Sequence, residues 1–280
     1  AHGWFTFSGD KISKSKGGLI SPRNLADNMV EVSGVSSELA VDVVRYALAS
    51  MLPFEGDREF SIEEVERKYN ADLANDLGNA LNRTLSMAAK FVEGVVPAGP
   101  SEPAAVEACE AAKKEVETYA EEHRWDLMID RAIGLVRFLN KYIDDRKPWA
   151  LAKENSAELP GVIRSMLLCL RTASGLIAPV MHRTSAAMAA QMNLPPITDW
   201  SEIATEASLS AGTVLGTPEP MFPRIDPKVV AARQQQPKPA KKETNQKSMN
   251  PEANKPEQQQ GKAPETELIG IEDFAKVQLR

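Results

Sequence analysis

A basic loop rich in hydroxyl groups lies near the start of the chain, and its residue types suit a polyphosphate ligand. Lys11 and Lys14 are separated by Ile12-Ser13 and followed by Ser15 and glycines. Each lysine supplies a positive charge and three donors, and the hydroxyl groups add further donors. Glycines let such a loop close on a ligand. The same residues also suit a solvated surface loop, so both interpretations remain open at this level.

A second polar set follows one face of a predicted helix. Asn75, Asn79 and Asn82 recur at helical spacing, and Arg83 lies one turn after Asn79. Asparagine is a poor helix former, so three of them in one helix need a reason. They either cap loops and bond to a neighbouring helix, or they form a surface that reads base edges. The opposite face is the expected core face, and it carries Leu73, Leu77, Leu81 and Leu85.

Trp149 is the third candidate, and it follows Pro148 in a basic segment that also contains Arg146 and Lys147. A tryptophan usually anchors a hydrophobic core. An exposed tryptophan beside cationic side chains is also a platform on which an unstacked base can stack. The sequence around Trp149 is compatible with both roles.

These candidates must be positioned mainly by helices. An aromatic run at 4–7 and turn residues at 8–10 predict a short hairpin. Beyond it, Ser-Pro at helix starts and Gly or Pro at helix ends predict long helices with short connections. This arrangement is typical of an α-helical bundle. The expected helices cover 22–32, 38–51, 61–93, 102–122, 125–142, 160–177 and 183–192, with one further turn at 149–153.

Composition limits the function classes. The 280 residues carry a net charge of −6, so any RNA contact must be local and depend on a few cations. The two cysteines, Cys109 and Cys169, are too few for a zinc cluster and are expected to be buried, inert thiols in a reducing cytosol. No run of 18 apolar residues predicts a membrane span. Residues 234–265 are rich in Gln, Lys and Pro and predict a disordered linker.

The lysine loop, with the preceding His2-Gly3-Trp4 segment, closely resembles the second signature of class I aminoacyl-tRNA synthetases in the form found in methionine enzymes. The resemblance implies that Lys11, Ser13, Lys14 and Ser15 bind ATP, with Mg²⁺, and stabilise the departing pyrophosphate. Lys14 is then the residue expected to contact the phosphates, with Lys11 in support. Position 12 is Ile where the family usually has Met.

Two later segments resemble the anticodon-binding domain of methionine–tRNA ligases. They are residues 72–84 and residues 139–149. In that family an Asn and an Arg four residues apart, together with the Trp after a Pro, recognise the CAU anticodon of tRNA(Met). The resemblance assigns these roles to Asn79, Arg83 and Trp149.

The resemblance also implies a domain organisation. It consists of the end of a class I catalytic domain (1–20), a connecting stem-contact region (21–60), the helical anticodon-binding domain (61–226), a disordered linker (227–267) and the start of an OB-type tRNA-binding domain (268–280).

We therefore expect a C-terminal part of a cytoplasmic, ATP-dependent methionine–tRNA ligase. The first catalytic signature, the methionine pocket and any zinc site are expected in a preceding part, with no metal site in these residues. We expect no methionine-dependent ATP–pyrophosphate exchange by this chain alone. We also expect a monomer, with homodimerisation dependent on the C-terminal domain. The alternative is a free-standing tRNA-binding helical module without catalysis, which would have no need of the lysine loop.

Overall fold

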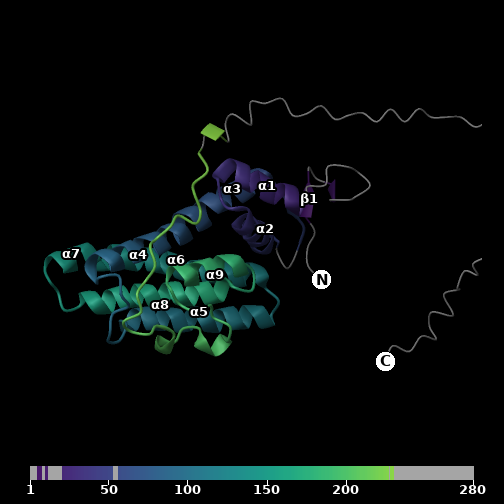
Figure 1. Ribbon diagram of the computed structural model, residues 1–280. Coiled ribbons are helices and arrows are strands. Elements are labelled where there is room, and N and C mark those ends of the chain that lie inside the picture. Colours follow the sequence, from purple (N-terminus) through teal and green to yellow (C-terminus); the bar gives the residue numbers. More distant parts are fainter. Residues whose placement is uncertain (1–4, 8–9, 12–20, 53–55, 227, 230–280) are drawn as a thin grey trace, which may run out of the picture. The chain divides into compact units, whose positions relative to one another are not determined.

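The computed structural model describes residues 5–7, 10–11, 21–52, 56–226 and 228–229, and its architecture is mainly α-helical (Figure 1). This confirms the predicted fold class. The N-terminal elements are β1 (Phe5–Phe7), β2 (Asp10–Lys11), α1 (Pro22–Ser33), α2 (Ser37–Met51) and β3 (Arg58–Glu59). The remaining elements are α3 (Ile62–Lys68), η1 (Tyr69–Gly78), α4 (Asn79–Phe91), α5 (Pro103–Glu121), α6 (Trp125–Arg146), α7 (Pro148–Lys153), α8 (Leu159–Ile177), α9 (His182–Gln191), η2 (Trp200–Glu202) and η3 (Glu206–Ser208).

The strands form a small sheet in the order β2-β1-β3. The predicted hairpin is confirmed, because β1 and β2 pair antiparallel with Thr6 opposite Lys11. The parallel partner β3 was not predicted, since it comes from a segment far along the chain. Phe5 and Phe60 pack edge to face with their ring centroids 5.5 Å apart, which attaches the hairpin to the helical region.

The first helices begin and end at the predicted signals. The Ser21 side chain accepts from the Arg23 amide, and Gly34 closes α1 in the left-handed conformation at φ 73°. The Ser61 hydroxyl accepts from the Glu64 amide at 3.1 Å, as expected for the start of a helix. These boundaries depend on neighbours in the sequence, so local chemistry is enough to predict them.

The predicted helix over 61–93 is a continuous rod of three segments, because α3 passes into η1 and η1 passes into α4. η1 is a π-helix of ten residues, which the sequence pattern did not predict. The residues at both joins, Lys68 and Asn79, keep right-handed helical backbone angles. The predicted core face is confirmed, with Leu73, Leu77, Leu81 and Leu85 almost completely buried.

α8 is the central helix of the bundle, and it is buried from Val162 to Ile177. It packs against α5, α6, α9, α4 and α7. α2 packs on α6 and α9, and its buried Asp42 accepts from the Thr184 amide of α9 at 2.7 Å. In the part of the chain that the structure describes, no helix is both long and apolar enough to cross a membrane.

Candidate nucleic-acid interface

Asn79 begins α4, and Arg83 lies one turn further along the same helix. Asn79 is exposed, whereas the side chain of Arg83 is 25% exposed. Arg83 Nη2 donates to Asp144 Oδ1 at 2.6 Å, and Asp144 belongs to the last turn of α6. This ion pair ties α4 to the end of α6 and holds the guanidinium near the surface.

Trp149 lies at the start of α7, and only Lys147 separates this helix from α6. Lys147 has φ 47° and ψ 63°, a left-handed conformation that is costly for a residue with a side chain and unusual before proline. The Lys147 amide donates to the Ile143 carbonyl at 3.0 Å, and the Lys147 carbonyl accepts from the Ala150 amide at 2.8 Å. The turn presents Trp149 with 44% of its surface exposed, so Trp149 is not a core anchor.

The fold brings these two candidate segments together. α7 packs beside α4, and the Arg83–Asp144 pair joins α4 to the helix that leads into α7 (Figure 1). Arg83 and Asp144 are 61 positions apart in the sequence. An exposed aromatic ring, an exposed amide and a guanidinium therefore lie on neighbouring helices, which suits stacking on a base together with hydrogen bonding to base edges.

The other two asparagines of the predicted stripe differ from each other. Asn82 is exposed, and its Oδ1 accepts from the Ser86 hydroxyl at 3.2 Å. Asn75 is partly buried, and its Oδ1 has no hydrogen-bond partner among the described residues. Asn140 of α6, which is outside the stripe, does bond to a neighbouring helix: its Nδ2 donates to the Asp76 carbonyl at 3.1 Å.

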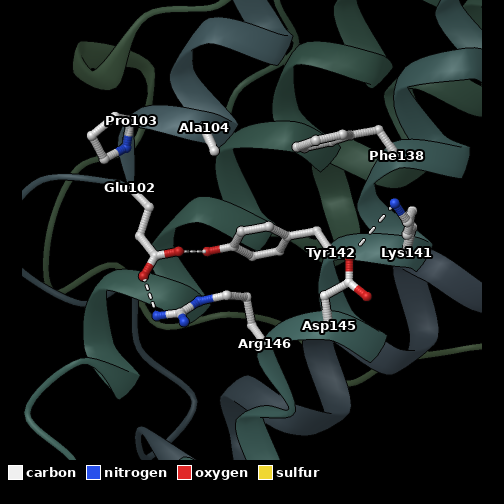
Figure 2. A pocket seen from close by; sticks show the side chains of 8 residues that line it. All are labelled: Glu102, Pro103, Ala104, Phe138, Lys141, Tyr142, Asp145 and Arg146. Atoms are coloured by element: carbon white, nitrogen blue, oxygen red, sulfur yellow. Dashed lines mark hydrogen bonds and ion pairs between the residues drawn. The ribbon is translucent and has the colours of Figure 1, made fainter.

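A polar cluster fixes the end of α6 beside an open pocket of about 510 Å³ (Figure 2). The Glu102 carboxylate accepts from the Tyr142 hydroxyl and from Arg146 Nη2, both at 2.5 Å. Arg146 also bonds to Glu158 at 2.8 Å. Burial, and then the bond to Glu102, raise the pKa of Tyr142, so the phenol stays protonated at neutral pH. Since Arg146 is the last residue of α6, this cluster supports the turn that presents Trp149.

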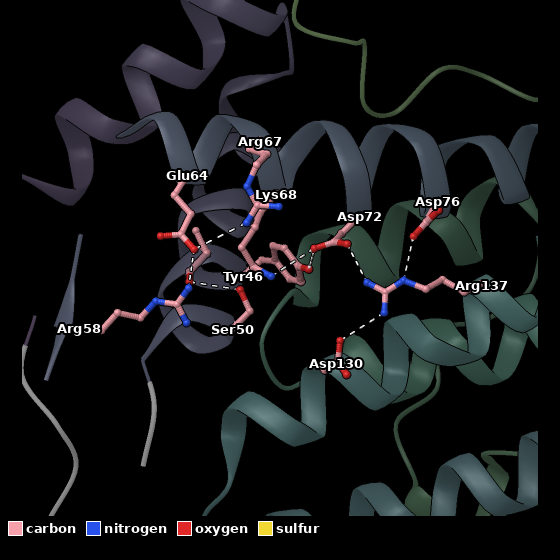
Figure 3. A network of polar contacts seen from close by, with 11 residues as sticks. Tyr46, Ser50, Arg58, Glu64, Arg67, Lys68, Asp72, Asp76, Asp130 and Arg137 are labelled. Atoms are coloured by element: carbon pink, nitrogen blue, oxygen red, sulfur yellow. Dashed lines mark hydrogen bonds and ion pairs between the residues drawn. The ribbon is translucent and has the colours of Figure 1, made fainter. Parts of the chain in front are cut away.

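A second network lies where η1, α2 and α6 meet (Figure 3). Asp72 accepts from the Tyr46 hydroxyl at 2.5 Å and from Arg137 Nη2 at 2.7 Å, and Arg137 Nε donates to Asp76 at 3.1 Å. Burial alone would raise the pKa of Asp72, but the bonds from Tyr46 and Arg137 and the charge of Lys68 hold it below its ordinary value. The pKa of Asp76 is raised, chiefly by burial.

The sequence analysis missed Asp144, Arg137 and the paired aspartates. Their charges look like those of ordinary solvated helix faces. The partners of Arg137 on η1 are 61 and 65 positions away, so no local spacing shows the pairing. Two local signals were present: Asp72 and Asp76 are like charges four residues apart, which repel, and Lys68 lies four residues before Asp72, with which it pairs at 3.3 Å.

The predicted phosphate-binding residues lie almost wholly outside the described part of the chain. Ser13, Lys14 and Ser15 are among the residues that the structure does not describe. Lys11 belongs to β2, and its side chain is not described either. The predicted linker, apart from residues 228–229, and the segment 268–280 are also outside the described residues.

The two cysteines are buried, as predicted, but they are neighbours in space. The Sγ atoms of Cys109 on α5 and Cys169 on α8 are 3.8 Å apart. The contact with Cys109, together with burial, raises the pKa of the Cys169 thiol, which keeps it protonated. Across the described ranges, no group of three or more His, Cys, Asp or Glu side chains is arranged to hold a metal ion.

Two family models match the chain. The model described as the anticodon binding domain of methionyl tRNA ligase matches residues 96–239. The model described as class I tRNA synthetases (M) matches residues 1–85, which include Asn79 and Arg83.

Relatives and solved structures agree with these models. A methionine–tRNA ligase of Caldanaerobacter subterraneus is 33% identical over 287 residues, covering 100% of this chain and 41% of the relative. A methionine–tRNA ligase of Streptococcus pyogenes is 36% identical, covering 81% of this chain and 34% of the relative. The solved methionyl-tRNA synthetase of Mycobacterium tuberculosis in complex with methionyl-adenylate is 30% identical with a TM-score of 0.64, covering 80% of this chain and 43% of that one. The chain thus spans about two fifths of the length of such proteins.

Proposed function

Because the chain belongs to the methionyl-tRNA ligase family, we propose that it reads the CAU anticodon of tRNA(Met) for an ATP-dependent methionine–tRNA ligase. The observation that supports this most directly is the exposed Trp149 on a helix that packs beside α4, where Asn79 and Arg83 lie. Since the chain spans 41% of its relative, activation of methionine and its transfer to tRNA are proposed for the ligase as a whole.

Each of the three side chains has a distinct role in this proposal. Trp149 stacks on one anticodon base, since its ring is exposed and the α6–α7 turn holds it in place. Asn79 and Arg83 donate to the edges of anticodon bases. These bases are unpaired, so their hydrogen-bonding edges are exposed. Arg83 donates to Asp144 through Nη2, and this bond orients the guanidinium before RNA binds.

The catalytic contribution of the chain is proposed from its lysine loop. Lys14, supported by Lys11, contacts the phosphates of ATP, which binds with Mg²⁺, and Ser13 and Ser15 add hydroxyl donors. Positive charge there stabilises the pyrophosphate as it departs. The same proposal includes three further points. They are the domain division at residues 20, 60, 226 and 267, the cytoplasmic location, and dimerisation through a further C-terminal domain.

The interface is tested by binding of a hairpin RNA with a CAU loop to the 280-residue chain. Asn79→Ala and Arg83→Met should each weaken binding about 5- to 150-fold, because a good contact to a base edge contributes about 1–3 kcal/mol. The affinity is measured by fluorescence titration of labelled RNA.

Asn82→Ala is the matched control, because Asn82 is an exposed residue of the same type on the same helix. We expect its affinity to stay within about twofold of the unchanged chain. A hairpin with a different loop sequence tests specificity. Equal binding of both hairpins by the unchanged chain, or unchanged affinity in Asn79→Ala and Arg83→Met, would contradict the proposed function.

A further inference from the structure

The π-helical form of η1 is unusual for its length. In a π-helix each amide bonds five residues back, and π-helices mostly occur as single turns, often at functional sites. η1 extends over ten residues, and its last residue directly precedes Asn79. A helix with five-residue hydrogen bonds turns through a smaller angle per residue than an α-helix. The direction in which Asn79 and Arg83 point therefore depends on η1 keeping this form.

One arginine of α6 holds two aspartates of η1 that lie one helical turn apart. Arg137 donates through Nη2 to Asp72 at 2.7 Å and through Nε to Asp76 at 3.1 Å (Figure 3). The planar guanidinium has a rigid arrangement of donors, so it constrains the spacing of the two carboxylates. The second oxygen of Asp72 accepts from Tyr46 of α2, so this part of η1 is held from two sides.

Asn140, one turn further along α6, adds a contact to the backbone of η1. Its Nδ2 donates to the Asp76 carbonyl, which also accepts from the Asn79 amide where the π-helix ends. Asp144, one more turn along the same face of α6, holds Arg83. Three successive turns of α6 therefore contact η1 and the start of α4.

We propose that Arg137 and Asn140 are positioning residues for anticodon recognition, because they keep η1 in the π-helical form that directs Asn79 and Arg83. This inference rests on the proposed function of those two residues. Because π-helices are rare and mostly limited to single turns, a ten-residue one needs support from neighbouring helices. On the α6 side, that support comes from the double contact of Arg137 with Asp72 and Asp76 and from the bond of Asn140 to the Asp76 carbonyl.

The test uses Arg137→Met and Arg137→Lys in the 280-residue chain. Methionine keeps much of the side-chain length without the charge, and lysine keeps the charge without the fork that joins two carboxylates. We expect both variants to bind the CAU hairpin about tenfold more weakly and to discriminate less between it and a hairpin with one anticodon base changed. The ratio of the two affinities is the deciding measurement, since a merely structural role would leave it unchanged.

Arg131→Met is the matched control, because Arg131 is also on α6 and pairs with Glu115 at 2.9 Å on a different face. It should leave the ratio unchanged. Circular dichroism and urea unfolding check that the variants fold. If Arg137→Met does not fold, Asp76→Asn replaces it, since Asp72 keeps its partners in that variant.

The affinity of Asn79→Ala for the CAU hairpin, measured in parallel, distinguishes a failure of the positioning role from a failure of the proposed function. Loss of binding in Asn79→Ala with an unchanged ratio in the Arg137 variants overturns the positioning role alone. Full binding in Asn79→Ala overturns the proposed function. Loss in Asn79→Ala together with a reduced ratio in the Arg137 variants supports both.

Discussion

Trp149→Ala should weaken binding of a CAU hairpin about 5- to 150-fold, because stacking of a base on an aromatic ring contributes about 1–3 kcal/mol. Trp149 is 44% exposed, so its removal takes little from the hydrophobic core. The free energy of unfolding should therefore change far less than the free energy of binding. Titration of the labelled hairpin and urea unfolding of the same variant measure the two quantities.

Trp125→Ala is the control for this variant, because Trp125 is 49% exposed but lies at the opposite end of α6. It should bind the hairpin like the unchanged chain. Trp149→Phe keeps an aromatic face and should recover part of the affinity lost in Trp149→Ala. Equal losses in Trp149→Ala and Trp125→Ala would show that neither ring stacks on an anticodon base.

Arg164→Met should lower the free energy of unfolding by about 3 kcal/mol, because it leaves several buried acceptors without a donor. The side chain of Arg164 is 7% exposed and lies on the central helix α8. It donates to the Pro97 carbonyl at 2.9 Å, to the Leu209 carbonyl at 3.1 Å and to the Glu206 carboxylate at 2.8 Å. These bonds join α8 to the loop before α5, to η3 and to the residue after η3, so their loss affects two distant parts of the chain.

Urea unfolding followed by circular dichroism measures this effect. Arg67→Met is the control, since Arg67 is 68% exposed and its contact with Glu64 is 3.7 Å long. Its effect should stay within about 0.5 kcal/mol, as is usual for an exposed ion pair. If Arg164→Met and Arg67→Met had similar free energies of unfolding, the prediction would be contradicted. Water would then satisfy the carbonyl and carboxylate acceptors that lose the Arg164 side chain.

Local chemistry in the sequence was sufficient to predict the helical architecture. The Ser-Pro start of α1, the left-handed Gly34 and the Ser61 cap act on neighbours within a few residues, so the sequence order contains the necessary information. The leucines from Leu73 to Leu85 predict a buried face for the same reason, since their period matches that of a helix.

The candidate site could be predicted only in part. Asn79, Arg83 and Trp149 were found from spacing and from their resemblance to a known family. The exposure of Trp149 could not be predicted, because a core anchor and a stacking platform have the same residue type. The left-handed Lys147 decides that exposure, and its conformation is maintained by bonds to both flanking helices.

Tertiary contacts alone decided three further features. The ten-residue π-helix lies in a segment whose apolar spacing predicts an α-helix, and its aspartates are held by Arg137 of another helix. Cys109 and Cys169 are 60 positions apart in sequence, yet their sulfur atoms are 3.8 Å apart. Arg83 depends on Asp144 for its orientation. Each feature depends on the packing of helices that are distant along the chain, and residue spacing within one helix does not encode which neighbour it will meet.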